Sequence, residues 1–365
     1  MDMKSLLRQL VEIESPSSDK AAVDRVGARV AEEARRLGAQ VEVVPNVETG
    51  DHVILRFPSA DGRTQGGILL LCHMDTVFPL GTLERLPFRE ADGKLYGPGV
   101  LDMKAGIVIA LAAVESAQAH RLRHPVTLLC TSDEETGSHT SRALIERLAR
   151  ESAMTFVLEG AMPDGALKIW RKGVGEFKVH VRGRAAHAGG DHKNGRNAIE
   201  EMAHQVIAIQ KLTDYDKGTT VSVGVIQGGT VSNVVPEEAS IEVDVRILQP
   251  EEWSRLETAM RSLHPVLDGT TIAMTGFLNR GPMPVTETTK TVFAKVQSIA
   301  ADLGMDVQSG GTGGVSDANF VAALGLPVLD GLGAVGEGYH SEREFIRAAS
   351  LEERAKLLSA LIQNW

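Results

Sequence analysis

The stretch 67–75, GILLLCHMD, runs from an apolar segment straight into a histidine and an aspartate, and 125–133, PVTLLCTSD, has the same texture. Short runs rich in Val, Ile and Leu are typical of strands buried on both faces of a sheet. We therefore predict strands at 67–73 and 125–131. The apolar stretch 104–119 between them is long enough for a helix. Strands that alternate with helices indicate an α/β layer with a mainly parallel sheet.

The pattern extends toward the N-terminus. Helical periodicity covers 5–13 and 20–37, and Gly38 is placed to end the second helix. Two further strand-like runs follow at 41–44 and 52–57. These elements belong to the same α/β layer.

From residue 174 the pattern of apolar and polar residues changes. EFKVHVRG at 176–183 alternates apolar and polar side chains with the period of two that a half-buried strand requires. The segments that follow predict a helix, two strands, a helix and a strand, at 197–212, 219–229, 238–248, 250–263 and 271–277. The order β-α-β-β-α-β is that of a ferredoxin-like α+β sandwich.

After Pro284 the sequence again has the α/β pattern of the N-terminal part. It predicts a helix, a Gly-rich loop, a second helix and a strand, at 286–303, 309–314, 317–324 and 327–333. The chain has 365 residues, more than a single core usually holds. We therefore expect two domains: a discontinuous one formed by 1–173 and 284–365, and an inserted one, 174–283.

Charge and cysteine content exclude several classes of protein. The chain has 38 basic and 48 acidic residues, hence a formal charge of −10, and no Lys/Arg-rich run. Nucleic acids and anionic membranes are therefore poor partners. Cys72 and Cys130 lie in apolar runs and are expected to be reduced core thiols, which favours a cytoplasmic location. A periplasmic location stays open if a signal peptide has been removed.

Two short motifs carry candidate chemistry. A carboxylate at Asp75 can hold the ring of His73 by accepting its second N–H, as happens beside metal-bound imidazoles. The pair also suits a strand-end histidine next to a helix cap, which is the commoner case. In LYGPGVLDMKAG, Asp102 sits where a Gly-rich turn enters an apolar helix, and alone it is most simply an N-cap.

Further acids and a histidine follow predicted strands. TSDEETGS places Glu134 and Glu135 after the run 125–131, Glu159 ends the apolar run TFVLEG, and His340 lies in GYHSE. Each alone suits a solvated turn. Ligand sites of open α/β sheets gather at the carboxyl ends of the strands. Two histidines and three carboxylates there match a site for two divalent cations.

The set of motifs resembles the M20 family of co-catalytic zinc peptidases and deacylases, and within it the glutamate carboxypeptidase branch. The resemblance spans nearly the whole chain, and the motifs occur in the family's order: CHMDTV, GPGVLDMKAG, SDEETGS, VLEG, GRAAHAG, GGTVSNVVP, GGVSDANF and GYHSE. It implies that His73 and Glu159 bind one zinc ion, that Glu135 and His340 bind the other, and that Asp102 bridges them. It also implies a cis peptide bond after Asp102.

The resemblance assigns the remaining catalytic roles. Asp75 would orient His73, and Glu134 would be the general base that takes a proton from the attacking water and returns it to the leaving amine. His187, in GRAAHAGG, would donate to the oxyanion, commonly from the partner subunit of a dimer. Without the family pattern, His187 suits an exposed turn equally well.

Three residues are candidates for substrate binding. Arg280, in FLNRGP, matches an arginine that grips a free α-carboxylate, and Asn233 matches a companion polar contact. Arg246 is a weaker candidate because strand arginines usually face solvent. The Gly-rich stretch 309–314 lacks the Lys-Ser or Lys-Thr of a P-loop, so we expect its backbone to lie close to the substrate.

The expected function is a di-zinc exopeptidase, with cobalt or manganese as alternative metals. It would release a C-terminal amino acid, glutamate or another acidic residue, from N-acyl or peptidyl substrates with a free carboxylate. The alternative is an N-acyl amino acid deacylase of the acetylornithine deacetylase or succinyl-diaminopimelate desuccinylase kind. A non-catalytic binding protein would lack Glu134 or a ligand, and none is missing. The resemblance also implies a homodimer built through the inserted domain.

Overall fold

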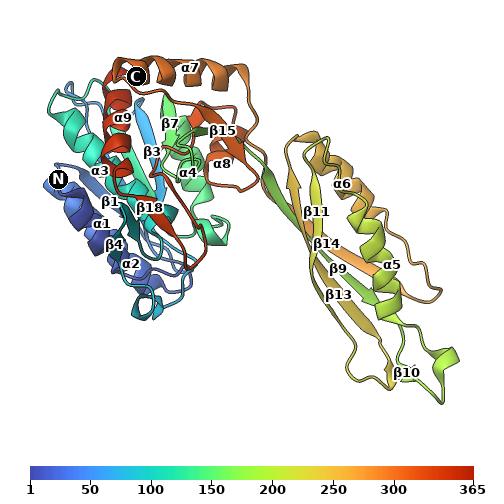
Figure 1. Cartoon of the computed structure of the whole chain (residues 1–365). Helices are drawn as coiled ribbons and strands as arrows, with labels where there is room; N and C mark the ends of the chain where they lie inside the picture. Colours follow the sequence, from blue (N-terminus) through green and yellow to red (C-terminus); the bar gives the residue numbers. More distant parts are fainter. The chain divides into compact units, whose positions relative to one another are not determined.

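The computed structural model describes residues 1–365, and the chain divides into two units (Figure 1). The first contains Met1–Trp170, Val285–Thr312 and Ser316–Trp365, and the second contains Arg171–Pro284 with Gly313–Val315. Arg171 Nη1 donates to the carbonyl oxygens of Gly314 and Val315, two of the last three residues of this unit.

A six-stranded mixed sheet forms the centre of the first unit. Its order is β1-β2-β6-β3-β7-β16, with bounds Gln40–Val44, His52–Phe57, Val126–Thr131, Ile68–His73, Met154–Val157 and Val328–Leu329. The strands β6, β3, β7 and β16 are parallel neighbours, as predicted. By contrast, β2 is antiparallel to both β1 and β6. The prediction of a parallel sheet is thus correct for β6, β3, β7 and β16 and wrong for β1 and β2. The short connection after β1 allows antiparallel pairing of β1 with β2.

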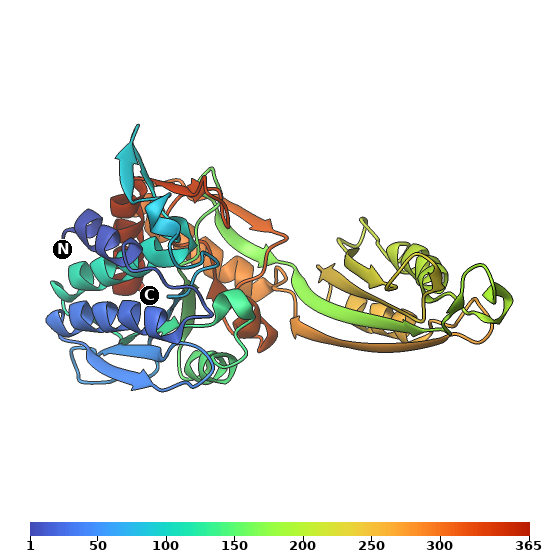
Figure 2. The same ribbon diagram turned by 90° about the horizontal axis from the view of Figure 1, so that it is seen from below.

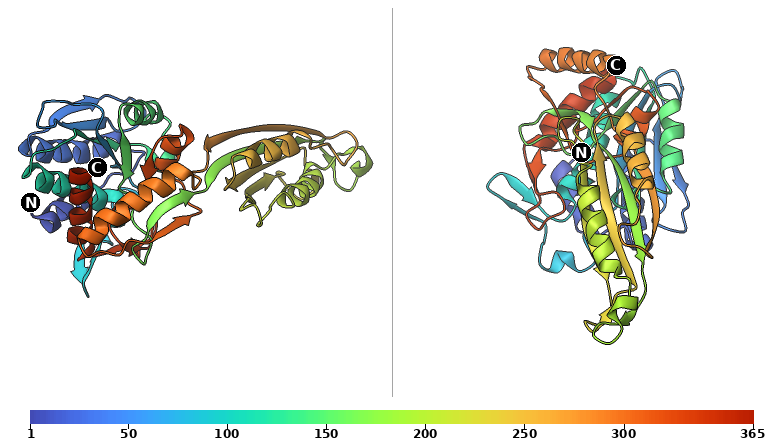
Figure 3. Two further views of the ribbon diagram at one scale, coloured as in Figure 1. Left: turned by 90° about the horizontal axis from the view of Figure 1, so that it is seen from above. Right: turned by 90° about the vertical axis from the view of Figure 1, so that its right-hand side faces the viewer.

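Helices cover this sheet. Leu70 and Cys72 of β3 pack in one apolar cluster with residues of α1 (Met3–Val11), α2 (Lys20–Arg36), α3 (Ala105–Gln118) and α9 (Ser350–Asn364). Figure 3 shows α7 (Glu287–Asp302) packed against α9. Leu69 and Leu71 point to the opposite face and are buried as well. Burial of both faces explains why the strand sequences are continuously apolar.

Two further helices, α4 (Arg142–Arg150) and α8 (Ala318–Ala323), pack against each other in the first unit. None of the helices in the chain combines the length and the apolar character needed to cross a membrane.

The sequence did not predict a small antiparallel sheet in the first unit. Its order is β17-β18-β5-β4, with bounds Gly336–Glu337, Phe345–Arg347, Lys94–Tyr96 and Arg89–Ala91. Strands of two or three residues are too short to show periodicity. This sheet places the segment that carries His340 beside the turn that leads to Asp102, and His340 therefore follows β17 rather than β16.

The Gly-rich stretch is also partly a strand. Residues Ser309–Thr312 form β15, which pairs with β8, Leu167–Arg171. A Cβ on Gly311 would lie 2.2 Å from the indole of Trp170. The absence of a side chain at Gly311 therefore serves strand packing. The expectation that the backbone of 309–314 lies close to the substrate stays a prediction.

The second unit has the predicted ferredoxin-like order. Its elements are β9, α5, β11, β13, α6 and β14, with bounds Gly173–Arg182, Ala198–Gln210, Thr220–Gly228, Glu238–Ile247, Glu251–Arg261 and Thr271–Arg280. The sheet order is β11-β13-β9-β14, and all neighbours are antiparallel. Figure 2 shows the long strands β9 and β14 side by side. Both helices cover one face, where Met202 and Leu256 pack on Phe177.

Candidate metal centre

Three parallel strands deliver candidate ligands to one edge of the main sheet. His73 is the last residue of β3, Glu135 lies in the short helix Glu134–Thr136 that follows β6, and Glu159 follows β7 by two residues. Because β6, β3 and β7 are neighbours, their carboxyl ends meet at the same place. This adjacency brings together side chains that are far apart in the sequence.

Asp102 reaches the same edge from an irregular turn. It lies within the π-helical segment Val100–Lys104, where its φ of −118° and ψ of 88° are not helical. The Asp102–Met103 peptide bond is cis, as the resemblance implied. The side chain is therefore not a simple N-cap and points toward the histidines.

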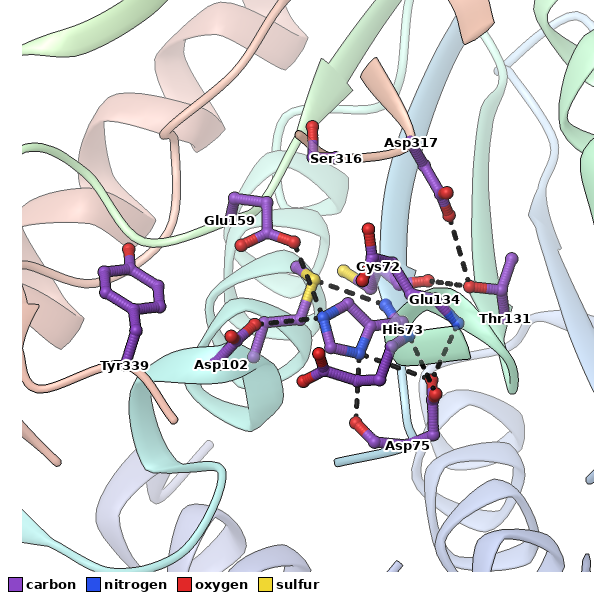
Figure 4. Close-up of polar contacts among 12 residues, drawn as sticks. Cys72, His73, Asp75, Asp102, Thr131, Glu134, Glu159, Ser316, Asp317 and Tyr339 are labelled. Atoms are coloured by element: carbon purple, nitrogen blue, oxygen red, sulfur yellow. Dashed lines mark hydrogen bonds and ion pairs between the residues drawn. The ribbon is translucent and has the colours of Figure 1, made fainter. Parts of the chain in front are cut away.

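The carboxylate of Asp102 lies between the two candidate histidines. Its Oδ1 is 3.1 Å from His73 Nε2, and its Oδ2 is 3.0 Å from His340 Nε2. Figure 4 shows Asp102 and Glu159 on the same side of the His73 ring. Each oxygen of one carboxylate thus faces a different imidazole, which is the arrangement that a ligand shared by two cations requires.

Each histidine also has a carboxylate of its own. Glu159 Oε1 lies 3.4 Å from His73 Nε2, and Glu135 Oε2 lies 3.1 Å from His340 Nε2. Ligand atoms of His73, Asp102 and Glu135 all lie within 4.8 Å of one another. The second oxygen of Glu135, Oε1, is buried without a hydrogen-bond partner. Nitrogen and oxygen donors in this arrangement fit two divalent cations.

The protonation of these groups reflects the crowding of carboxylates. Burial would lower the pKa of His73, but its hydrogen bonds to Asp102 and neighbouring carboxylates raise it well above the ordinary value. Hydrogen bonds to Asp102 and Glu135 raise the pKa of His340 to about 10. Burial raises the pKa of Glu135 to about 7. In the absence of cations, protons on the histidines therefore partly neutralise the carboxylates.

Asp75 is fully buried and connects two segments that carry candidate ligands. His73 Nδ1 lies 3.0 Å from the Asp75 backbone oxygen and 3.4 Å from its carboxylate, so the carbonyl is the nearer acceptor. The carboxylate accepts from Ser17 Oγ at 2.7 Å and from the backbone N–H groups of Glu134 and Glu135 at 3.2 Å. Asp75 thus orients His73 mainly through its backbone and holds the Glu134–Glu135 turn with its side chain.

Glu134, the candidate base, is 9% exposed. Figure 4 shows it close to His73 and Asp75. Its backbone N–H is held by Asp75. The structure thus brings all seven of the predicted residues of the first unit together at one edge of the sheet: His73, Asp75, Asp102, Glu134, Glu135, Glu159 and His340.

The other four candidates belong to the second unit. His187 is exposed, and its Nδ1 accepts from the backbone N–H groups of Gly189 at 3.1 Å and Gly190 at 3.0 Å. An Nδ1 that accepts leaves the ring proton on Nε2. Asn233 lies beside it, because its backbone oxygen accepts from Ala188 N–H at 2.9 Å.

Arg246 and Arg280 lie at one end of the four-stranded sheet of the second unit, opposite the end that is near His187 and Asn233. Arg280 is 3% exposed, and both Arg280 and Arg246 pair in register with Val174 of β9. Arg246 forms an ion pair with Asp244 at 2.9 Å. The segment with Asn233 lies past Arg182, at the opposite end of β9, which is roughly 27 Å away along an extended strand. Asn233 and Arg280 of one chain therefore cannot contact one small substrate together.

Sequence reasoning missed one buried acid near the centre. Glu344, four residues after His340, is 3% exposed and accepts hydrogen bonds from three backbone N–H groups of the turn that carries Asp102. In the sequence it is one of several charged residues in HSERE, and no pattern there distinguishes a buried acid from an exposed one.

Comparison with known proteins identifies relatives of the chain. The profile of peptidase family M20/M25/M40 matches residues 69–364. Carboxypeptidase G2 of Pseudomonas sp. (strain RS-16) is 29% identical over 98% of this chain and 88% of its own length. Acetylornithine deacetylase of Proteus mirabilis (strain HI4320) is 28% identical over 99% of this chain and 96% of its own.

Solved structures share the fold. Aminopeptidase PepT from Bacillus cereus ATCC 10987 superposes with a TM-score of 0.82 at 22% identity, covering 99% of this chain and 97% of the other. The YXEP protein of Bacillus subtilis, described as a dinuclear metal-binding peptidase of the M20 family, superposes with a TM-score of 0.72 at 17% identity over 99% and 97%. The chain belongs to peptidase family M20/M25/M40 and is a metallo-hydrolase of that family.

Proposed function

We propose that the protein is a di-zinc exopeptidase that hydrolyses the amide bond to a C-terminal amino acid, glutamate or another acidic residue. The observation that carries the proposal is the position of Asp102 between His73 and His340, with one carboxylate oxygen 3.0–3.1 Å from each ring. A structural zinc site would have a closed, Cys-rich shell, and Cys72 and Cys130 are buried free thiols.

The donor set divides into two groups that share one residue. His73 and Glu159 would hold one cation, His340 and Glu135 the other, and Asp102 would contribute one oxygen to each. When bound, the two cations would make a water molecule more acidic and polarise the scissile carbonyl. The YXEP protein supports a count of two, since it is described as dinuclear.

The protein's own residues would move the protons. Glu134 is left over from the donor set and lies at the same sheet edge, held by Asp75 through its backbone N–H. It would accept the proton of the attacking water and then return it to the leaving amine. Its burial beside Asp75 limits the positions that its carboxylate can take.

His187 would stabilise the oxyanion by donation from Nε2. Gly189 and Gly190 donate to Nδ1, so the ring proton lies on Nε2 of an exposed side chain. Because His187 and Asn233 lie at the end of the sheet opposite Arg280, a site that uses all three requires two chains. We therefore include a homodimer in the proposal.

The surface of the second unit supports dimer formation. The strand β11 is at the edge of its sheet, and Val225 and Ile226 on it are 43% and 58% exposed. Ile207 of α5 is 58% exposed as well. An apolar edge strand beside an apolar helix face is suited to pairing with a second copy.

Arg280 supports the preference for a free carboxylate. It is buried at the end of β14, where a guanidinium can bind a carboxylate with two parallel hydrogen bonds. The alternative is an N-acyl amino acid deacylase, which the similarity to acetylornithine deacetylase favours. Identities of 29% and 28% do not separate the two activities.

The test compares three substrates on zinc-reconstituted protein. The proposal predicts that glutamate is released from an N-aroyl-glutamate much faster than acetate is released from acetylornithine. The third substrate, the α-amide of the N-aroyl-glutamate, should be hydrolysed poorly. Faster deacetylation would establish the alternative activity, and binding of all three without turnover would indicate a non-catalytic protein.

A further inference from the structure

Glu344 occupies a pocket made of backbone N–H groups. Its Oε2 accepts from Gly99 N at 3.0 Å, and its Oε1 accepts from Leu101 N at 2.7 Å and Asp102 N at 3.0 Å. Successive N–H groups that converge in this way form a concavity for an anion. Here the acceptor is the carboxyl group of a side chain more than 240 residues away in the sequence, and burial raises the pKa of Glu344 to about 8.

The turn depends on such an acceptor. Gly99 has a φ of +71°, and Asp102 departs from helical geometry, so the ordinary helical hydrogen bonds do not pair these N–H groups. Buried N–H groups without acceptors are rare because they cost a full desolvation. Glu344 therefore determines the backbone conformation that carries the Asp102 carboxylate.

Glu344 also anchors His340. Glu344 lies four residues after His340, which itself has a φ of +56° and a side chain that is 54% exposed. The small sheet formed by β17 and β18 provides only two-residue pairing on one side of this loop. A single carboxylate thus connects the loop of His340 to the turn of Asp102.

Asp75 makes the equivalent connection on the other side of the centre. Its carboxylate joins the end of β3, which carries His73, to the turn of Glu134 and Glu135. Asp75 is assigned by the family resemblance, and Glu344 is not. The two buried acids have the same physical task, since each accepts backbone N–H groups from a second segment that carries a ligand.

We propose that Glu344 is a positioning residue that holds the turn of Asp102 and the loop of His340 together at the metal centre. This inference rests on the proposed function. Loss of Glu344 should weaken the cation held by His340 and Glu135 far more than the one held by His73, because β3 and Asp75 still hold His73. Removal of outer partners of metal ligands typically lowers metal affinity by about 10–100-fold.

The test is a calorimetric zinc titration of the metal-free Glu344→Gln variant, with zinc content measured after dialysis. The amide keeps the size of the side chain but places an NH2 group against N–H donors. The ion held by His340 and Glu135 should bind about 10–100-fold more weakly, and the ion held by His73 and Glu159 should be weakened less, although it shares Asp102. In turnover assays, kcat should recover at high zinc while KM stays unchanged, which general misfolding would not produce.

The matched control is Glu201→Gln in the second unit. Glu201 is also fully buried, and it accepts the backbone N–H groups of Val266 at 2.9 Å and Leu267 at 2.7 Å. Its loss should lower stability without changing zinc binding. If Glu344→Gln does not fold, Glu344→Asp decides, since the shorter carboxylate cannot reach all three N–H groups and should weaken the same ion.

The outcomes distinguish this inference from the proposed function. Equal weakening of both ions, or unchanged binding of both, in the Glu344 variants would overturn the positioning role while the two-cation centre stands. If the unaltered chain binds no zinc, the proposed metal centre itself is wrong.

Discussion

His73 and His340 face the same carboxylate from different surroundings. The side chain of His73 is 1% exposed and ends a central strand, whereas that of His340 is 54% exposed and lies on a loop after a two-residue strand. The sheet therefore fixes one half of the candidate centre, and the other half lies on a loop whose Glu344 carboxyl group accepts hydrogen bonds from the turn of Asp102. The comparison shows that candidate ligands arranged symmetrically about Asp102 can be held by a rigid sheet on one side and by a loop on the other.

The largest effect is expected for Glu134, the candidate base, which is not a candidate ligand in either half of the centre. Glu134→Gln should leave both zinc ions bound and reduce kcat by about 10²–10⁴-fold, because the variant cannot accept a proton. Turnover is measured at saturating substrate together with zinc content. Undiminished turnover would remove Glu134 from the reaction, and loss of zinc would show that it belongs to one of the halves.

Replacing each histidine tests the unequal supports directly. In metal-free protein, His73→Ala leaves Asp75, Asp102 and Glu159 without their shared partner and should lower the free energy of unfolding by about 3–5 kcal/mol. His340→Ala changes a half-exposed side chain and should cost about 0–1 kcal/mol. Urea denaturation of both variants, with chelator present, gives the difference. Equal losses would contradict the account of a rigid half and a loop half.

Replacing Arg280 in the second unit should weaken substrate binding and should leave zinc binding in both halves of the candidate centre unchanged. Arg280→Ala should lower kcat/KM by about 10–100-fold for a substrate with a free α-carboxylate, since a charged hydrogen bond is lost. Arg246→Ala, the weaker candidate, which pairs with the same residue of β9 and forms an ion pair with Asp244, should lower kcat/KM less. An equal loss on the amide substrate would exclude the proposed contact.

The last prediction concerns the pH dependence of zinc binding, where the effect of a single pH unit is small. The pKa of His340 is about 10 without metal, above its ordinary value of 6.5, so the ring is protonated at pH 7 and zinc must displace the proton. Affinity should rise by about tenfold per pH unit for each displaced proton up to about pH 10.

The raised pKa of His340 also determines the direction in which the stability of the metal-free protein changes with pH. In metal-free protein, the contribution of His340 is fully present below pH 6.5 and is lost as the pH rises through about 10. The prediction for zinc binding is checked by calorimetric zinc titrations in buffers with different ionisation enthalpies, which measure the protons released when zinc binds. Binding without proton release would contradict the raised pKa.

The half built on strands could be predicted from the sequence. Apolar runs that end at His73 and Glu159 place these residues at the carboxyl edge of a sheet, and β3 and β7 do pair in parallel. The position of Asp102 between two histidines came from the resemblance, since the residue alone suits an N-cap.

The half built on a loop could not be predicted in the same way. The strands β17 and β18 are two and three residues long, and their pairing depends on contacts distant in sequence. Glu344 looks like a surface acid until the turn at 99–102 surrounds it. The need for Gly311 likewise becomes visible only when Trp170 packs on it.

A zinc titration of the metal-free chain beside its His340→Ala variant tests the central claim most directly, with bound zinc measured by elemental analysis. The account predicts two ions per unaltered chain and one, retained through His73 and Glu159, in the variant. A single ion in the unaltered chain, or two in the variant, would contradict a centre in which Asp102 joins two unequal halves.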